Sequence, residues 1–194
     1  MLAGIASLPV TSLRPVRGTA AEIVALLRAW DAADDPTPLV VETSGSTGRP
    51  KRVVLSRAAM RASADATHER LGGPGQWLAT LPPTYVAGLQ VLFRSVRAGT
   101  DPVERAADLT AGRTYVSLVP TQLHRLVDDP ALARFDTVLV GGAALDPALR
   151  ERADRAGVRV VTTYGMSETC GGCVYDGRPL DGVRVDVVDG LVRL

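Results

Sequence analysis

Short apolar runs that alternate with helical patterns constrain the fold of this chain more than any other feature of its 194 residues. Strand-like runs are predicted at residues 39–41, 77–81, 115–119, 136–140 and 158–163. Apolar residues at helical spacing predict helices near residues 20–30, 57–71, 86–97, 121–128 and 147–156. Strands that alternate with helices predict an α/β fold built on a largely parallel, helix-covered sheet.

The expected helix starts carry local capping signals. Thr19 and Glu22 have capping-box spacing, and Ser56 is placed to cap the following helix. Asp146 and Pro147 give the N-cap and first-turn order expected for the last helix. A glycine-rich loop directly follows the first expected strand, so the first unit is interpreted as strand, loop and helix.

The pattern changes near the C-terminus, where the sequence VRVDVVDGLVRL alternates between apolar and polar residues. Asp189 and Gly190 suit a tight hairpin turn within this run. We therefore expect residues 1–182 to form the α/β part and residues 183–194 to begin a small antiparallel β subdomain. Because the chain stops at Leu194, inside the second arm of the hairpin, we expect this subdomain to be truncated.

The overall composition is that of an ordinary soluble globular protein. Hydrophobic residues make up 46% of the chain and charged residues 22%, with a formal net charge of +1. The 22 basic and 21 acidic residues are interspersed, so no nucleic-acid partner is predicted. We find no stretch apolar enough to span a membrane and no basic residue early enough for a signal peptide. A cytoplasmic location is predicted.

Both cysteines lie in one CGGC run, as Cys170 and Cys173. Such spacing could indicate a thiol redox pair or half of a zinc site. Zinc needs about four ligands, and the two histidines, His68 and His124, are distant in sequence and fall in helical patterns. We favour the interpretation that the cysteines are small residues in a tight, glycine-rich turn.

The glycine-rich run TSGSTGRPK indicates a phosphate-binding loop. Gly45 and Gly48 let successive backbone amides point at phosphate oxygens, while Lys51 supplies a mobile positive charge. The spacing differs from GxxxxGK[ST], which excludes comparison with a P-loop NTPase. A flexible surface loop is the alternative. The predicted phosphate-binding residues are Thr43, Ser44, Gly45, Ser46, Thr47, Gly48 and Lys51.

This run resembles the signature loop of the adenylate-forming superfamily, which includes acyl-CoA synthetases, peptide-synthetase adenylation domains and luciferases. A second run, YGMSET, follows an expected strand, where ligands of open parallel sheets bind. By the resemblance, Tyr164 packs near adenine, Gly165 and Ser167 contact the nucleotide, and Glu168 binds Mg²⁺. Lys51 and Glu168 are then the expected catalytic residues.

Weaker matches follow in the family's order. The segment LPPTYVAG resembles the part that lines the acyl pocket, although Tyr85 stands where the family normally has a histidine, which puts the role of a proton-bearing cation there in doubt. The segment VGGAA resembles the loop that contacts adenine and the acyl group, and GRPLDGV resembles the turn into the next subdomain. The resemblance implies substrate contacts at Tyr85, Gly88, Arg94, Gly141, Gly142 and Met166, with Gly142 also contacting the nucleotide.

The short region before the phosphate loop and the runs YVAGLQVLFRS and MSETCGG are most similar to o-succinylbenzoate CoA ligases of menaquinone biosynthesis. The resemblance implies a carboxylic acid substrate, ATP with Mg²⁺, and CoA. Arg94 would bind the carboxylate that is not activated, or it is a solvated helix residue. The family's ribose-binding Asp and its mobile C-terminal domain with a catalytic Lys are absent here, so we expect no turnover by these residues alone.

Several alternatives stay open. The chain could act on another acyl or aryl acid with the same chemistry, or it could bind a substrate without turnover. A purely structural α/β domain is a third reading. A homodimer is also left open.

Overall fold

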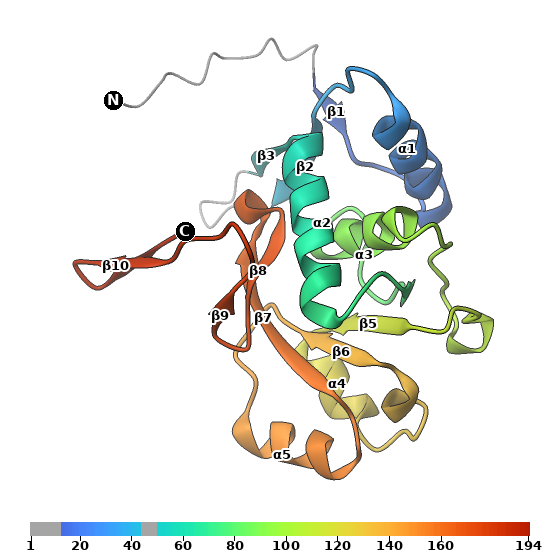
Figure 1. Ribbon diagram of the computed structural model, residues 1–194, viewed down its shortest axis with the longest axis vertical. Helices are drawn as coiled ribbons and strands as arrows, with labels where there is room; N and C mark the ends of the chain where they lie inside the picture. Colours follow the sequence, from blue (N-terminus) through green and yellow to red (C-terminus); the bar gives the residue numbers. More distant parts are fainter. Residues whose placement is uncertain (1–12, 44–49) are drawn as a thin grey trace.

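The computed structural model describes residues 13–43 and 50–194 (Figure 1). Its N-terminal half contains β1 (Arg14–Pro15), α1 (Ala20–Ala32), β2 (Leu39–Thr43), β3 (Lys51–Leu55), α2 (Arg57–Leu71), β4 (Gln76–Leu78) and α3 (Val86–Arg97). The rest contains β5 (Thr114–Leu118), α4 (Pro120–Leu126), β6 (Thr137–Val140), α5 (Pro147–Arg155), β7 (Val160–Met166), β8 (Gly171–Tyr175), β9 (Arg178–Pro179), β10 (Asp186–Val188) and β11 (Leu191–Arg193). Short 3-10 turns are η2 (Ala106–Asp108), η3 (Leu132–Arg134) and η4 (Ser167–Thr169).

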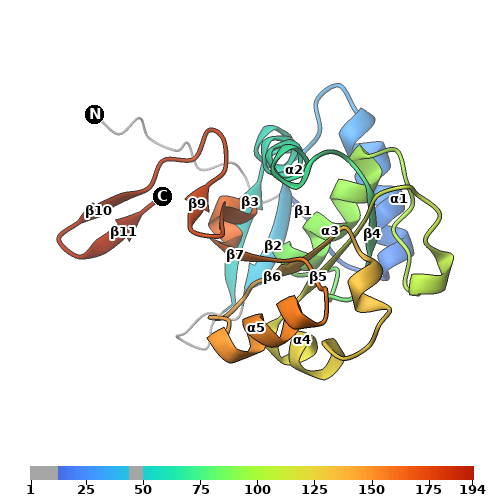
Figure 2. The ribbon, with the colours of Figure 1, turned by 60° about the horizontal axis from the view of Figure 1, so that its bottom comes forward.

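The main sheet has six strands in the order β4-β5-β6-β7-β8-β9. Its first four strands are parallel, and β8 and β9 continue it antiparallel. Helices α4 and α5 lie together along one side of this sheet, away from α2 (Figure 2). Side chains alternate accordingly: Val116 and Val138 pack in the core with α4 and α5, whereas Tyr115 and Leu139 pack with α2 and α3. The predicted α/β class with a largely parallel sheet is confirmed.

The first expected strand lies in a separate sheet of order β1-β2-β3. The predicted unit of strand, loop and helix is wrong, because β3 pairs antiparallel with β2 before α2 begins. In β3, Val53 and Leu55 are buried while Val54 is 49% exposed, so the strand has one face in the core. The pairing sets Thr43 opposite Lys51, at the two ends of the glycine-rich run.

The predicted helix starts are confirmed. Thr19 and Glu22 form a complete capping box at α1, and the Ser56 side chain accepts a hydrogen bond from the backbone of α2. Asp146 caps α5 with Pro147 in its first turn. Each cap satisfies backbone N–H groups that the first helical turn leaves without partners.

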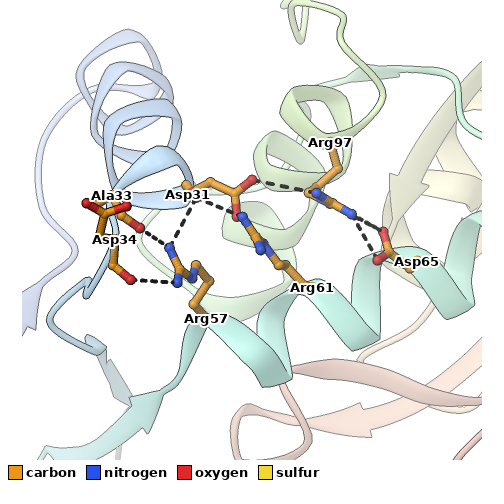
Figure 3. Close-up of polar contacts among 7 residues, drawn as sticks. All are labelled: Asp31, Ala33, Asp34, Arg57, Arg61, Asp65 and Arg97. Carbon is orange, nitrogen blue, oxygen red and sulfur yellow. Dashed lines mark hydrogen bonds and ion pairs between the residues drawn. The ribbon is translucent and has the colours of Figure 1, made fainter.

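Charged side chains connect the three N-terminal helices across their surfaces (Figure 3). Asp31 near the end of α1 accepts a 2.6 Å hydrogen bond from Arg61 Nε on α2 and lies 3.7 Å from Arg97 Nη1 on α3. Arg97 also bonds both carboxylate oxygens of Asp65 at 3.0 Å. Arg57 donates to backbone carbonyls at the C-terminal end of α1. These contacts link α1, α2 and α3 at the protein surface.

The CGGC run differs from the predicted turn. Cys170 does occupy a left-handed turn conformation with φ of 57°, but Cys173 lies within β8, and both side chains are buried. A Cβ atom at Gly172 would lie within 3.3 Å of the Thr163 Cβ in β7, so the glycine allows this close approach, and the run forms a strand because it pairs antiparallel with β7. Within residues 13–43 and 50–194 no group of three or more His, Cys, Asp or Glu side chains could hold a metal ion.

The predicted C-terminal hairpin is confirmed in β10 and β11, which pair antiparallel. Asp189 and Gly190 both have positive φ, of 52° and 76°, as a tight hairpin turn requires. The hairpin extends away from the remaining elements in both views (Figures 1 and 2). The division at residue 182 stays a prediction. In the part of the chain that the structure describes, no helix meets the length and apolarity needed to cross a membrane.

Candidate active site

A cavity of about 360 Å³ opens where the parallel strands of the main sheet end. Ligands of open α/β sheets bind at this edge, outside the carboxyl ends of the strands. The ends of β5 and β6, the C-terminal half of β7, both ends of β8, and helix α3 form the walls. The wall residues from the strands and the loops after them include Ser117, Leu118, Val119, Leu139, Gly141, Gly142, Thr163 and Tyr175.

The structure brings together all six residues that the sequence predicted to contact the acid. The cavity is lined by Tyr85, Gly88, Arg94, Gly141, Gly142 and Met166, and also by the predicted nucleotide contacts Gly165 and Ser167. Tyr164 is 52% exposed and is not among the lining residues. The predicted phosphate contacts Ser44, Gly45, Ser46, Thr47 and Gly48 lie outside the described residues.

Two glycines allow backbone segments around the cavity to approach one another. A Cβ atom at Gly88, in α3, would collide with the backbone oxygen of Pro82. A Cβ atom at Gly165, in β7, would collide with the backbone oxygen of Gly171 in β8. The register of β7 and β8 shifts between Tyr164 and Gly165, so this close approach coincides with an irregularity in the strand pair.

Arg94 is the one charged side chain among the described residues that line the cavity, and it is only 4% exposed. Its guanidinium carbon lies 5.1 Å from the centroid of the Trp77 ring, and its Nη2 donates a 3.3 Å hydrogen bond to the Tyr175 hydroxyl. Within the described residues it has no ion-pair partner, and its Nε has no acceptor. The alternative of a solvated helix residue is therefore wrong. A buried cation is costly without a partner of opposite charge, and an anionic ligand in the cavity would supply one.

Lys51 and Glu168 form an ion pair outside the cavity wall. Lys51 Nζ at the start of β3 lies 2.5 Å from Oε1 of Glu168 in η4, directly after the cavity-lining Ser167. The hydrogen bond from Lys51 lowers the pKa of Glu168. Their side chains are 63% and 43% exposed, so a ligand can reach both. Thr43, also predicted to bind phosphate, donates from its hydroxyl to the Lys51 carbonyl at 3.3 Å.

Sequence reasoning missed Gln90, which lines the cavity one helical turn before Arg94. Its amide nitrogen donates a 2.7 Å hydrogen bond to the backbone oxygen of Cys170, two residues after Glu168. Gln90 thus ties α3 to the segment that carries the metal-ligand candidate. The available signal was its spacing from Arg94, because residues four apart share one face of a helix. Thr163 and Tyr175 were also missed.

Comparison with protein families gives one match. Residues 26–191 match the family described as AMP-binding enzyme. The matched range includes the cavity, Lys51 and Glu168, and it covers most of the chain.

Individual relatives agree with this match. A protein of Mycobacterium tuberculosis (strain ATCC 25618 / H37Rv), described as a probable 2-succinylbenzoate–CoA ligase, is 50% identical over 186 residues, which are 87% of this chain and 49% of that protein. Wild-type E. coli MenE with a bound m-phenylether-linked analogue of OSB-AMS superposes with a TM-score of 0.68, at 31% identity over 80% of this chain and 38% of that one. Bacillus subtilis o-succinylbenzoate coenzyme A synthetase (MenE) with ATP and magnesium gives 0.68, at 27% identity with the same coverage. The chain thus spans about half or less of the length of these relatives.

Proposed function

The chain belongs to the AMP-binding enzyme family, and we propose that it forms the acid- and phosphate-binding part of a 2-succinylbenzoate–CoA ligase of menaquinone biosynthesis. The ligase would act in the cytoplasm on 2-succinylbenzoate, ATP and CoA. The relative from M. tuberculosis carries that description at 50% identity, and the E. coli relative binds an analogue of OSB-AMS. Below, the complete ligase means a polypeptide in which these 194 residues are joined to the remaining length of such a ligase.

One observation carries the choice of substrate: the cavity holds a buried Arg94 with no carboxylate partner in the part of the chain that the structure describes. 2-Succinylbenzoate has two carboxylates, one on its ring and one on its succinyl chain. If Arg94 binds the ring carboxylate, the succinyl carboxylate is left for activation. A cavity of about 360 Å³ is in the range that small-molecule sites occupy.

Lys51 and Glu168, which lie beside Ser167 and outside the cavity, suit the phosphates of ATP and their metal ion. Lys51 is a mobile, half-exposed cation at the end of the glycine-rich run. In the proposed reaction the succinyl carboxylate attacks the α-phosphorus of ATP, pyrophosphate leaves, and the acyl group passes from AMP to the sulfur of CoA. Lys51 stabilises the negative charge that gathers on the phosphate oxygens during the first step. The substrate carboxylate is itself the nucleophile, so the protein needs none.

Glu168 fits a magnesium ion that is held mainly by the nucleotide. It offers one accessible carboxylate, and Mg²⁺ in nucleotide sites is commonly bound through one or two carboxylates together with substrate phosphates and water. The ion supplies positive charge against the phosphates when it is bound. Oε1 of Glu168 accepts the hydrogen bond from Lys51, so holding the ion through that oxygen would require this bond to open, and Lys51 would then be free for the phosphates as well.

The test is pyrophosphate release by the complete ligase with ATP and Mg²⁺ over a panel of aromatic and fatty acids. We expect release with 2-succinylbenzoate at least tenfold faster than with any monocarboxylic acid of the panel. Turnover of another acid, with none of 2-succinylbenzoate, would replace this substrate by that acid and leave the ligase chemistry intact. No release with any acid would contradict the ligase assignment itself.

A further inference from the structure

Arg94 stands at one end of a chain of hydrogen bonds that crosses the protein interior. Its Nη2 lies 3.3 Å from the hydroxyl of Tyr175, which lies 2.9 Å from the hydroxyl of Thr67 on α2. Thr67 in turn lies 2.8 Å from the backbone oxygen of Ser63. Tyr175 is 2% exposed and Thr67 is fully buried, so both hydroxyls are largely removed from bulk water.

The donor and the acceptor of each of these three hydrogen bonds can be assigned. The carbonyl of Ser63 can only accept, so the Thr67 hydroxyl donates to it. The Thr67 oxygen must then accept the proton of Tyr175, and the Tyr175 oxygen is left to accept from Arg94, which can only donate. The hydroxyl oxygen of Tyr175 therefore presents a lone pair to the guanidinium of Arg94. Rotating the hydroxyl proton away from Thr67 would break the hydrogen bond to Thr67.

The remaining contact of Arg94 does not fix the orientation of its guanidinium group. The Trp77 ring attracts the positive charge at 5.1 Å, but it offers no directed acceptor. The hydrogen bond to Tyr175 does fix the position of Nη2, and it leaves the other N–H donors of the fork-shaped guanidinium group for a ligand. Bidentate carboxylate binding depends on the orientation of that fork.

We propose that Tyr175 is a positioning residue that makes the cavity selective for acids with a second carboxylate, because it orients the Arg94 fork toward that group. This role rests on the proposed function of the cavity. It differs from a packing role in one measurable respect. A packing residue affects the binding of all acids alike, whereas a residue that acts through Arg94 affects only the affinity gained from the second carboxylate.

The experiment measures binding of two acids to the 194-residue chain by isothermal titration calorimetry. One acid is 2-succinylbenzoate, and the other is 4-oxo-4-phenylbutanoate, which is the same molecule without the ring carboxylate. The ratio of the two dissociation constants reports the selectivity for the second carboxylate. We expect Tyr175→Phe to lower this ratio by about tenfold, with the affinity for the monocarboxylic acid changed by less than about twofold.

Tyr115→Phe is the matched control. Tyr115 is also a fully buried tyrosine that packs on Trp77, but its hydroxyl donates to the backbone oxygens of Leu71 and Gly73 and it does not line the cavity. This variant should keep the wild-type ratio. In an Arg94→Met background, Tyr175→Phe should have no further effect on the ratio, because the group through which it acts is gone.

If Tyr175→Phe does not fold, as judged by thermal unfolding, Thr67→Val is the replacement. It removes the hydroxyl that accepts from Tyr175, and it should lower the ratio of the two dissociation constants severalfold. The wild-type protein is expected to prefer the dicarboxylic acid. If a folded variant, Tyr175→Phe or its replacement Thr67→Val, keeps that preference, the positioning role is overturned. Equal losses for both acids would overturn it too, in favour of packing. A wild-type chain that binds neither acid, or binds both equally, contradicts the proposed function of the cavity and removes the role with it.

Discussion

Lys51 Nζ and Glu168 Oε1 lie 2.5 Å apart although 117 residues separate them in the sequence. The contact joins β3 to η4, and so it joins the end of the glycine-rich run to the YGMSET segment. The two side chains neutralise each other in this arrangement. Since each would face a ligand of opposite charge when ATP and its metal bind, the pair is expected to open on binding.

Lys51→Met and Glu168→Gln should each reduce pyrophosphate release by the complete ligase by roughly 10²-fold or more. Lys51→Met removes a positive charge that would stabilise the transferring phosphates, and Glu168→Gln removes the carboxylate that would hold Mg²⁺. The melting temperature should hardly change, since an exposed ion pair contributes little to folding. Arg105→Met, which breaks another exposed pair, with Asp108, is the control and should keep full activity. Unchanged rates in the Lys51 and Glu168 variants would remove their assigned roles.

Arg94→Met should lower the affinity for 2-succinylbenzoate by at least about tenfold without lowering the stability of the folded chain. Replacing a buried charge that lacks a carboxylate partner with an apolar side chain of similar length is often neutral or stabilising. Calorimetry and urea unfolding measure the two quantities. Arg97→Met is matched to it on the same helix: it breaks contacts with Asp31 and Asp65, so it should lower stability and leave the affinity unchanged. The reverse pattern would contradict the assignment of Arg94.

The free energy of unfolding should fall in mild acid because His68 is buried in its neutral form. Burial, and after it the nearby Arg94 charge, lowers the pKa of His68 from 6.5 to about 4. Between these two values the unfolded chain binds a proton that the folded chain excludes. The stability is therefore complete above pH 6.5 and falls as the pH drops toward 4, by up to roughly 3 kcal/mol.

Urea unfolding at a series of pH values measures this dependence. His68→Gln should flatten it within the window between pH 6.5 and 4. His124→Gln removes an exposed histidine and serves as the control. An equally steep dependence in His68→Gln would show that other groups cause it.

Asp31→Asn should lower the free energy of unfolding by roughly 1–2 kcal/mol, because hydrogen bonds to charged groups contribute more than neutral ones. The Asp31 side chain is only 16% exposed and contacts both Arg61 and Arg97. Asp101→Asn removes a carboxylate that is 73% exposed and pairs, among the described residues, with Arg28 alone, so its effect should be close to zero. Similar effects of the two substitutions would indicate that the network in Figure 3 contributes no more than a single surface pair.

Helix ends and the parallel strands of the fold could be predicted from the sequence because they depend on local signals. The Thr19 capping box and the Asp146 cap act within one helical turn. Strands beside glycine-rich runs were missed, namely β3, which begins at the last residue of the TSGSTGRPK run, and β8, which begins within the CGGC run and ends at Tyr175. Glycines there indicate turns locally, whereas the strands form because distant partners, β2 and β7, pair with them.

The candidate site could be predicted in part. The residues expected to contact the acid do line one cavity, because they fall at strand ends and on one helix. The burial of Arg94 could not be predicted, since it depends on Trp77 and Tyr175, which belong to other elements. The contact with Tyr175 spans 81 residues of sequence. No local pattern indicates that a tyrosine in β8 accepts a hydrogen bond from α3.

A crystal structure of the chain with 2-succinylbenzoate tests most directly whether the cavity is the acid site of such a ligase. We expect the ring carboxylate within hydrogen-bond distance of the Arg94 guanidinium, and the succinyl carboxylate toward Ser167, on the side of Lys51 and Glu168. An acid bound outside this cavity, or bound in it with neither carboxylate on Arg94, would contradict the proposed site.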